Sequence, residues 1–421
     1  ALRSQLISNG YVFFSNSDTE VIIKAYHFWG EDCVNHLDGM FAFAIWDRSS
    51  QQLFVARDRM GIKPLYFNIT SKAFTFASNS QALLTQKLDK SINPVALHQQ
   101  LSLHGVVPAP NTIINGIQKL KPGTFFTLSP NGKLREKTYW QPCAKRLEEN
   151  ISDQDYIERT HELLTSAVMK RMSASDVPIG VLLSGGLDSS LIVALLKEAD
   201  HEDIRTFSIG FEDIDDEVGS EFEYSDQIVS KFKTQHKKYQ VSNKEVLPRL
   251  SEAVMNMSEP MVGQDAVAFY LLSEQVSKHT KVVLSGQGAD EAFAGYFWYP
   301  RMANEQGNEV ERFSKHYVDR PHDEYLQTVS SIYQGENHTH NWLNKEFLKP
   351  GADSFIDKVF RTDMTRLIVD DPVKRVDNMT MAWGLEARVP FMDTELVEWA
   401  LSMPPSLKMR DEGKYPLKQI S

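Results

Sequence analysis

Cysteine is scarce in this chain, which has only Cys33 and Cys143 among its 421 residues. Two cysteines cannot form a disulfide framework, so the composition is typical of a protein from a reducing compartment. The sequence also lacks an apolar run of membrane-spanning length and the opening pattern of a secretory signal peptide. These absences disfavour a disulfide-rich secreted domain and a membrane-spanning helix, and we expect a cytoplasmic protein.

Basic residues are outnumbered by acidic ones. Lys and Arg total 45 and Asp and Glu total 56, which gives a formal net charge of −11. This balance disfavours a general nucleic-acid-binding or anionic-membrane-binding surface, so we expect neither nucleic acid nor membrane as a partner. The chain also contains no G-x-x-x-x-G-K-[ST] sequence, which disfavours the P-loop chemistry of kinase-like enzymes and GTPases.

The remaining composition is that of an ordinary globular protein, with 42% hydrophobic and 24% charged residues. The length predicts two or three domains with sizeable cores. Both ends look interrupted, because residues 1–10 read as a helix already in progress and residues 414–421 as a helix just beginning. We therefore expect a fragment that is truncated at both ends.

The most informative sequence is Ser-Gly-Gly-Leu-Asp-Ser-Ser, residues 184–190. The apolar run 177–183 before it reads as a buried strand, and the run 191–196 after it reads as a helix. A glycine-rich turn between a strand and a helix is a natural anion site, because the first helical amides and the helix dipole point at one spot. A carboxylate there would repel phosphate unless a cation lay between them, so we interpret Asp188 as a Mg²⁺ ligand.

The alternative for this turn is a serine-capped helix without a ligand, which a bare Ser-Gly-Gly would favour. The aspartate, the two further serines and both apolar flanks favour a nucleotide site instead. A second strand-to-turn motif, Ser285-Gly-Gln-Gly-Ala-Asp-Glu291, repeats the pattern. If both strands end on one edge of a sheet, Asp290 can share the Mg²⁺ with Asp188. Taken alone, Asp290 would read as a helix N-terminal cap.

Residues 1 to about 140 are mostly strand-like. The alternation and turn residues predict three hairpins, which are Phe41–Asp47 with Gln51–Asp58, the stretch Leu65–Ser78, and a pair around Pro130-Asn-Gly132. Asp18–Gly30 is predicted to be a helix with an acidic first turn and a glycine stop, and by itself Asp18 reads as its N-cap.

A polar linker is predicted at 141–152, and strands and helices alternate after it. The predicted strands are 177–183, 204–211, 237–241 and 281–284, and the predicted helices are 157–172, 187–199, 225–233, 244–257 and 266–278. Such alternation predicts a doubly wound parallel sheet with helices on both faces, whose ligands sit at the carboxyl ends of the strands. Both glycine-rich motifs fall at such ends.

Two further groups of residues each fit either a structural role or a role in a binding site. Ile209 and Gly210 end an apolar strand and could form the wall of an adenine site, although core packing is the commoner role of such a strand. Glu386, Arg388 and Asp393 lie among apolar neighbours, where a buried ion pair and a substrate site are equally consistent with the pattern.

Lys414 follows a glycine and precedes a predicted helix. It reads either as an exposed surface lysine or as a cation that reaches a polyphosphate, where negative charge builds up on a leaving group. The acidic run Glu212–Glu223 is most simply a solvated loop.

A set of strings occurs in order along the chain, namely SDTEVI, GMFAFAIWD, RDRMGIKPLY, GVLLSGGLDSS, TFSIGF, LSGQGADE-x-FAGY and LEARVPFMD. Over essentially the whole chain these strings resemble the asparagine synthetase family. Its members join a class II glutamine amidotransferase, an N-terminal-nucleophile αββα sandwich, to an ATP pyrophosphatase-type synthetase of the adenine nucleotide α-hydrolase-like class. The resemblance implies an amidotransferase domain at 1–140, a linker at 141–152 and a synthetase domain at 153–421.

The resemblance also implies residue roles. Glutamine is hydrolysed in the first domain of the family, and ammonia travels through a tunnel to an acyl-adenylate in the second. Asp18 would hold the α-amino group of glutamine. In the second domain the implied residues are Leu183, Ile209, Ser285 and Gly286 for adenosine, Ser184, Gly185, Gly186, Leu187, Asp188, Ser189 and Ser190 for pyrophosphate, Asp188 and Asp290 for Mg²⁺, and Lys414, Gln287 and Glu386 for catalysis.

Two departures from the family matter. The family's glutaminase nucleophile is an N-terminal cysteine with its own α-amino group as base, and neither Cys33 nor Cys143 matches it. We therefore expect no glutamine hydrolysis from the polypeptide as written. Asparagine synthetases also carry Glu, and β-lactam-forming relatives Tyr, where this chain has Gln287. Glutamine cannot accept a proton, so we expect an acceptor other than aspartate.

The segments around 258–279 and 285–300 look most like the bacterial N-acetylglutaminylglutamine amide synthases, which make an osmoprotectant. We therefore expect an AMP-forming, glutamine-fed ligase that uses ATP and Mg²⁺ and amidates this dipeptide. An ordinary asparagine synthetase is the alternative, and an inactive binding or regulatory fragment is an alternative of another class. The oligomeric state stays open, with a homodimer among the alternatives.

Overall fold

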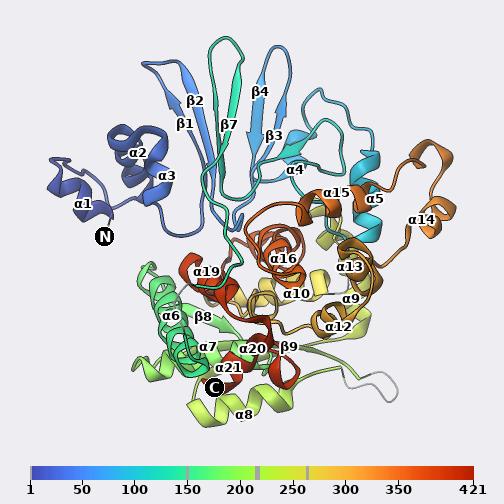
Figure 1. Ribbon diagram of the computed structural model, residues 1–421. Helices are drawn as coiled ribbons and strands as arrows, with labels where there is room; N and C mark the ends of the chain where they lie inside the picture. The colour runs from blue at the N-terminus through green and yellow to red at the C-terminus, as the bar shows by residue number, and fades with distance from the viewer. Residues whose placement is uncertain (1, 148–150, 214–218, 262–264) are drawn as a thin grey trace. The chain divides into compact units, whose positions relative to one another are not determined.

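The computed structural model describes residues 2–147, 151–213, 219–261 and 265–421. It divides into two compact units, one of Ala1–Leu88 and Gly116–Gln141, the other of Asp89–Asn115 and Pro142–Ser421 (Figure 1). The segment Asp89–Asn115 therefore leaves the otherwise continuous range predicted for the first domain and packs within the second unit.

The first unit contains two antiparallel sheets. One sheet has the order β1-β2-β6-β7 and the other the order β4-β3-β5. The bounds are β1 Ala42–Asp47, β2 Gln52–Arg57, β3 Tyr66–Ile69, β4 Phe74–Ala77, β5 Gln118–Lys119, β6 Thr124–Leu128 and β7 Leu134–Thr138. The three predicted hairpins are confirmed, because β1 pairs with β2, β3 with β4 and β6 with β7.

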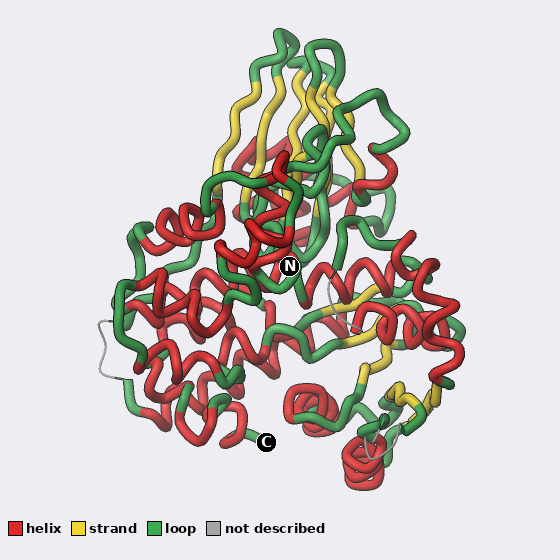
Figure 2. The backbone as a smooth tube through the Cα atoms, turned by 90° about the vertical axis from the view of Figure 1, so that its right-hand side faces the viewer, coloured by secondary structure: helices red, strands yellow, loops and turns green. Residues whose placement is uncertain are grey.

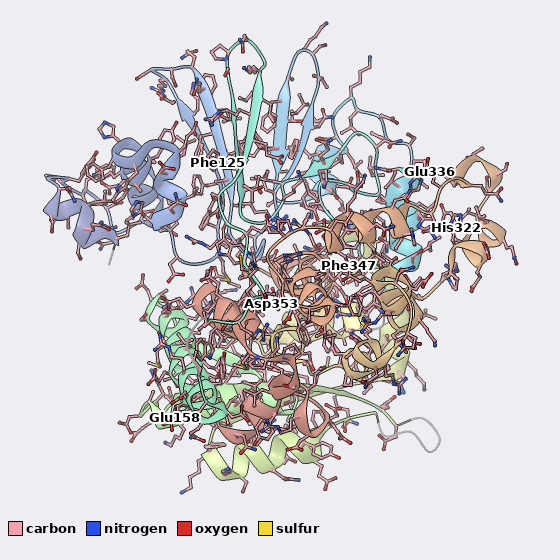
Figure 3. The ribbon with its side chains drawn as sticks, viewed as in Figure 1. Phe125, Glu158, His322, Glu336, Phe347 and Asp353 are labelled. Atoms are coloured by element: carbon pink, nitrogen blue, oxygen red, sulfur yellow. The ribbon has the colours of Figure 1, made fainter. Side chains whose placement is uncertain are left out.

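Phe125 and Phe126 are consecutive residues of β6 and lie on opposite faces of their sheet, as the two-residue period of a strand requires. The Phe126 ring lies 5.5 Å from that of Phe67 and 5.4 Å from that of Phe74, so this face meets the second sheet. Phe125, labelled in Figure 3, faces Phe54 and Tyr139 on the other side.

Helices pack against both sheets. The cluster around Phe125 also contains residues of α1 (Leu2–Ser8), α2 (Asp18–Trp29) and α3 (Cys33–His36). The short α4 (Ser80–Leu83) packs against β3 and β4. The layers thus run helix, sheet, sheet, helix, which confirms the predicted αββα arrangement.

The second unit is built on a five-stranded, fully parallel sheet with the order β10-β9-β8-β11-β12. The strands are β8 Ile179–Leu182, β9 Arg205–Phe211, β10 Gln235–Val241, β11 Val282–Leu284 and β12 Glu386–Arg388. The direction of winding reverses between β8 and β11, and a ligand crevice is expected at that point of a doubly wound sheet. The predicted parallel sheet is confirmed.

Helices cover both faces of this sheet. α6 (Asp153–Ser173), α7 (Leu187–Glu198) and α8 (Phe222–Phe232) pack together on one face (Figure 1). On the other face α10 (Asp265–Val276) packs against α9 (Asn243–Met255) and α18 (Pro372–Met381). Apolar residues of α10 and α18 form a core there with Leu182, Phe207 and Val283 of the strands.

Helices make up most of the remainder of the second unit (Figure 2). They are α5 Pro94–Ser102, α11 Ala289–Phe293, α12 Trp298–Asn304, α13 Glu309–Tyr317, α14 His322–Thr328, α15 His338–Phe347, α16 Phe355–Thr362, α17 Ile368–Asp370, α19 Thr394–Ser402, α20 Pro405–Lys408 and α21 Tyr415–Gln419. A π-helical turn, Asp363–Leu367, joins α16 to α17. In the part of the chain that the structure describes, no helix combines the length and the apolar character needed to span a bilayer.

Histidines connect α5 to two later helices. The His98 ring of α5 contacts Thr339 Oγ1 at 2.8 Å and His322 Nδ1 at 3.0 Å, and the His338 ring stands edge-on to it at 5.8 Å. His98 is almost completely buried, with 1% of its surface exposed. These contacts hold the segment Asp89–Asn115 within the second unit.

Two local predictions need correction. The N-cap of α2 is Ser17, whose side chain accepts a hydrogen bond from Thr19 N, so Asp18 is the first helical residue and not the cap. α8 begins at Phe222, before the predicted start. Of the acidic run Glu212–Glu223, residues 214–218 lie outside the described residues.

Candidate active site

A cavity of about 520 Å³ opens at the carboxyl ends of β8, β9 and β11, where the winding of the sheet reverses. Its walls include ten of the residues singled out from the sequence, which are Leu183, Ser184, Gly186, Asp188, Ser189, Ile209, Ser285, Gly286, Gln287 and Asp290. Three segments that are distant in sequence therefore meet around one space.

The turn 183–186 continues the hydrogen bonding of β8 and then opens into α7. Leu183 N donates to Phe207 O at 2.8 Å, which keeps the turn attached to β9. Gly186 is the N-cap of α7, and a glycine has no side chain that could accept a hydrogen bond from the first amides of that helix. Amides without a side-chain cap at a helix start favour an anion, because the helix dipole adds positive potential there.

The serine hydroxyls shape this turn. Ser184 Oγ lies 3.2 Å from Ser189 Oγ and accepts from Gly186 N at 3.2 Å. Ser190 Oγ is buried without a hydrogen-bond partner among the described residues. Of the predicted loop residues, Gly185, Leu187 and Ser190 do not form the cavity wall.

The second motif approaches the first because it carries a glycine. A methyl group built on Gly286 would come within 2.9 Å of Asp188 Cβ and 3.2 Å of Ser189 N. Real Cβ atoms do not tolerate such distances, so any larger residue at 286 would separate the two turns. The close approach places the start of α11 beside the start of α7.

Lys414 joins the two acidic residues of these turns. Its Nζ lies 2.7 Å from Asp188 Oδ2 and 2.7 Å from Asp290 Oδ1. The lysine and Asp188 side chains are only 15% and 20% exposed. Charge-assisted contacts of this length in a half-buried site are strong, so the three side chains form one electrostatic unit.

Burial and charge shift the ionisation of this unit. Burial is the main cause that raises the pKa of Asp188, with a further rise from the Asp290 charge and an opposing effect of Lys414. Burial acts to lower the pKa of Lys414, but the two carboxylates raise it above its ordinary value. Lys414 therefore carries a positive charge at neutral pH.

The donor set at Asp188 fits a divalent cation. Asp188 Oδ1 is buried and has no hydrogen-bond partner in the described part of the chain. Within those residues no group of three or more His, Cys, Asp or Glu side chains could hold a metal ion. Mg²⁺ commonly takes one or two carboxylates and completes its shell with water and substrate phosphates, so two aspartates suffice.

Glu386, Arg388 and Asp393 are not part of the cavity wall. Glu386 begins β12 and pairs in register with Val282, at the amino end of the sheet, and its carboxylate contacts Arg388 Nε at 2.7 Å. Asp393 contacts Arg171 Nη1 at 2.9 Å and caps α19. These contacts match the ion-pair alternative, and the structure does not bring Glu386 to Lys414 and Gln287.

Some residues of the cavity wall were not predicted from the sequence. Ser208, Phe222, Ser225 and Phe269 all contribute to the wall. Ser208 could have been found, because it lies beside Ile209 near the carboxyl end of β9, where ligands of a parallel sheet bind, and its hydroxyl donates to Leu183 O. Phe222 and Ser225 lie in the first turn of α8, and no local pattern marks them.

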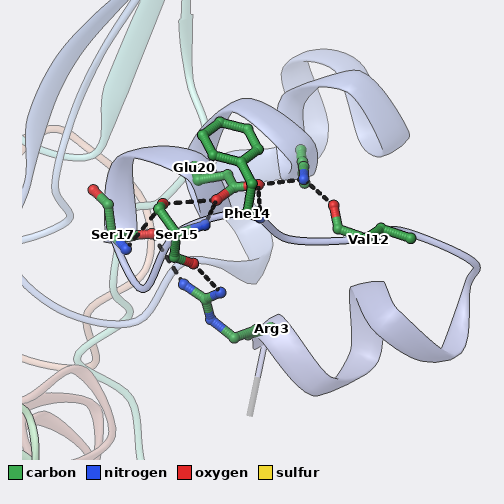
Figure 4. A network of polar contacts seen from close by, with 7 residues as sticks. Arg3, Val12, Phe14, Ser15, Ser17 and Glu20 are labelled. Atoms are coloured by element: carbon green, nitrogen blue, oxygen red, sulfur yellow. Dashed lines mark hydrogen bonds and ion pairs between the residues drawn. The ribbon is translucent and has the colours of Figure 1, made fainter.

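In the first unit, a buried carboxylate organises the loop before Asp18 (Figure 4). Glu20 accepts hydrogen bonds from Phe14 N at 3.1 Å and from Ser15 N and Oγ at 2.8 and 2.7 Å, and it pairs with Lys24. Burial opposes its ionisation, but these hydrogen bonds lower the pKa of Glu20 to about 2. Asp18 itself is exposed at the start of α2.

Comparisons with known proteins match both parts of the chain. The family model described as "Asparagine synthase" matches residues 159–421, and the one described as "Glutamine amidotransferase domain" matches residues 1–140. The first match covers more than half of the chain.

Curated relatives extend over nearly the whole chain. "Asparagine synthetase [glutamine-hydrolyzing] 1" of Bacillus subtilis is 30% identical over 100% of this chain and 71% of its own length. "Asparagine synthetase [glutamine-hydrolyzing] 3" of the same organism is 31% identical, covering 97% and 68%. "Putative asparagine synthetase [glutamine-hydrolyzing]" of Mycobacterium tuberculosis is 31% identical, covering 99% and 70%.

Proposed function

Because this chain belongs to the asparagine synthase family, we propose that it converts a carboxylate into an amide through an acyl-adenylate, with ammonia derived from glutamine. One observation carries this proposal. Asp188, Lys414 and Asp290 meet at the edge of a nucleotide-sized cavity, with one oxygen of each carboxylate 2.7 Å from the ammonium. This grouping suits the release of pyrophosphate from ATP.

The chemistry has two steps. A carboxylate oxygen attacks the α-phosphorus of ATP, the bond from that phosphorus to the bridging oxygen breaks, and pyrophosphate leaves. Ammonia then attacks the carbonyl carbon, AMP leaves, and the nitrogen loses a proton. Negative charge grows on pyrophosphate in the first step, and fixed positive charge there lowers the barrier.

The residues of the cavity divide these tasks. Leu183, Ile209 and Ser285 would bind the adenosine part, and the uncapped amides of α7 would hold phosphate oxygens. Lys414 would remain protonated and stabilise the leaving pyrophosphate. Asp188 and Asp290 would hold Mg²⁺, which when bound would neutralise the phosphate charge that these carboxylates would otherwise repel.

Gln287 is the residue of the cavity wall that bears on the acceptor. Its amide cannot take a proton, and it stands where asparagine synthetases carry Glu. We therefore favour N-acetylglutaminylglutamine as the acceptor, in agreement with the resemblance of the segments around 258–279 and 285–300. The relatives named asparagine synthetase favour aspartate, the precursor of asparagine, which is the second candidate.

The adenylation step is tested by substituting the proposed metal ligand. Asp188→Asn should abolish carboxylate-dependent exchange of pyrophosphate into ATP, because the amide cannot supply the charge that holds the cation. Asp200→Asn is the matched control, since Asp200 lies in the turn after α7 with a left-handed φ of 59° that asparagine also adopts. Full exchange in Asp188→Asn would refute the metal assignment.

The acceptor is tested with ammonia as the nitrogen donor, which makes the assay independent of glutamine hydrolysis. AMP is measured with either aspartate or N-acetylglutaminylglutamine present. AMP that forms only with the dipeptide supports the first candidate. AMP that forms only with aspartate overturns it and makes the chain an asparagine synthetase.

A further inference from the structure

The turn that follows α11 lies directly against the segment that carries Lys414. Lys414 N donates to Phe293 O at 2.9 Å, and Gly295 N donates to Asp290 O at 2.8 Å. Ala294, between Phe293 and Gly295, has a left-handed φ of 60°. Asp290 and Lys414 are thus held by one pair of interlocked backbone turns.

The backbone before α21 is fixed in an unusual conformation. Asp411, Glu412, Gly413 and Lys414 all have positive φ, at 51°, 63°, 91° and 52°. Residues other than glycine adopt this region rarely, and consecutive ones persist only where surrounding structure determines them. Here a methyl group on Gly413 would overlap Ala294 O and come within 3.1 Å of the carbonyl carbon, so the two turns pack without a gap.

Gly295 faces the two functional side chains of this site. A methyl group built on it would overlap both Asp290 Oδ1 and Lys414 Cε and would come within 2.9 Å of Asp290 Cγ. The φ of Gly295 lies outside the left-handed region, so alanine could adopt its backbone. The overlap involves side chains, which can swing away, so alanine would displace Asp290 and Lys414 and leave the fold intact.

We propose that Gly295 is a positioning residue of the active site. The space left by its missing side chain is where the Asp290 carboxylate and the Lys414 chain meet. The proposal rests on the proposed function, because it is through Asp290 and Lys414 that Gly295 acts. Nothing larger than hydrogen at this position is compatible with the 2.7 Å contact between their charged groups.

The experiment compares the full chain with Gly295→Ala in acceptor-dependent AMP formation. We expect kcat to fall about 100-fold, because a displacement near 1 Å of catalytic groups has effects of that order. The dissociation constant of AMP should change less than about threefold, since AMP lacks the phosphates that Lys414 and the cation would contact. Gly335→Ala is the matched control, because its new methyl would only touch His338 Nε2 at 3.8 Å.

A purely structural role for Gly295 predicts a different pattern. It would lower the thermal midpoint and weaken AMP binding together with kcat, and that result would overturn the proposal. In a double variant with Lys414→Ala the methyl can act only through Asp290, so the loss of kcat should be smaller than the product of the two single losses. Additive losses in the double variant would also contradict the proposal.

The role of Gly295 and the proposed function are refuted by different results. If the wild-type chain forms AMP and Gly295→Ala stays within threefold of it, only the role of Gly295 is refuted. If the wild-type chain neither forms AMP nor binds magnesium pyrophosphate in calorimetry, the proposed function is refuted, and the role of Gly295 with it.

Discussion

The histidine cluster that holds α5 should make this part of the second unit sensitive to acid. Burial is the main cause that lowers the pKa of His98, and the neighbouring His322 and His338 lower it further. The pKa of His98 falls from 6.5 to about 4. The Thr339 hydroxyl and the Tyr325 ring also contact His98 and carry no charge. In Figure 3, His322 is labelled on α14.

The sign follows from proton binding. Between pH 6.5 and pH 4 the unfolded segment binds a proton at His98 that the folded segment does not, so folding weakens as the pH falls. The contribution of neutral His98 to the stability of the folded segment is complete above pH 6.5 and is lost as the pH falls through about 4. A shift of this size corresponds to about 3 kcal/mol at 1.36 kcal/mol for each pKa unit.

Hydrogen exchange of residues 94–102 measures this effect locally. After correction for intrinsic exchange rates, the free energy of opening of α5 should be about 3 kcal/mol lower at pH 4 than at pH 7. His98→Gln cannot titrate and should flatten this dependence, whereas His201→Gln, in the loop after α7, should leave it unchanged. Equal pH dependence in wild type and His98→Gln would refute the reasoning.

Three further substitutions have defined outcomes. Lys408→Met should raise the free energy of unfolding in urea at pH 7 by about 1–3 kcal/mol. Lys408 is fully buried and has no hydrogen-bond partner among the described residues. Burial lowers its pKa to about 7. This gain should shrink as the pH rises from 7 toward 10.5, where the amine loses its charge in both states, and a destabilised variant would contradict the argument. Phe207→Ala should lower the free energy of unfolding by about 3–5 kcal/mol in the same measurement, since Phe207 belongs to the sheet core and is 2% exposed. A loss below about 1 kcal/mol would show that the surrounding side chains close around the smaller residue. Lys414→Ala should lower kcat for AMP formation about 100- to 1000-fold with AMP binding unchanged, and an unaltered kcat would remove Lys414 from the mechanism.

Local periodicity accounts for the elements that were predicted well. The alternation in Phe41–Asp47 and the turn Pro130-Asn-Gly132 are properties of a few adjacent residues, and both hairpins are present. The apolar runs on each side of residues 184–190 likewise predicted β8, α7 and the edge of the sheet where the cavity lies. Each of these signals is complete within about twenty residues.

The features that were missed depend on contacts across the chain. Glu386–Arg388 is a strand because it pairs with β11 about a hundred residues earlier, and Glu-Ala-Arg has no strand pattern of its own. α5 leaves the first unit because His98 meets Thr339 and His322. The roles of Ser17 and Asp18 at the start of α2 differ by one residue, which is within the usual uncertainty of a helix boundary.

Lys414 is far in sequence from Asp188 and Asp290, and this distance affects the order in which the site forms. Lys414 meets Asp188 across 226 residues. During synthesis from the N-terminus, the turn at 184–190 is made long before the residue that neutralises it, and the sheet between them must form first. Until that lysine docks, Asp188 and Asp290 lack their shared counter-charge, so the group of three charged side chains cannot form before residue 414 has been synthesised. Appearance of pyrophosphate exchange during refolding would then report the docking of the segment that carries Lys414.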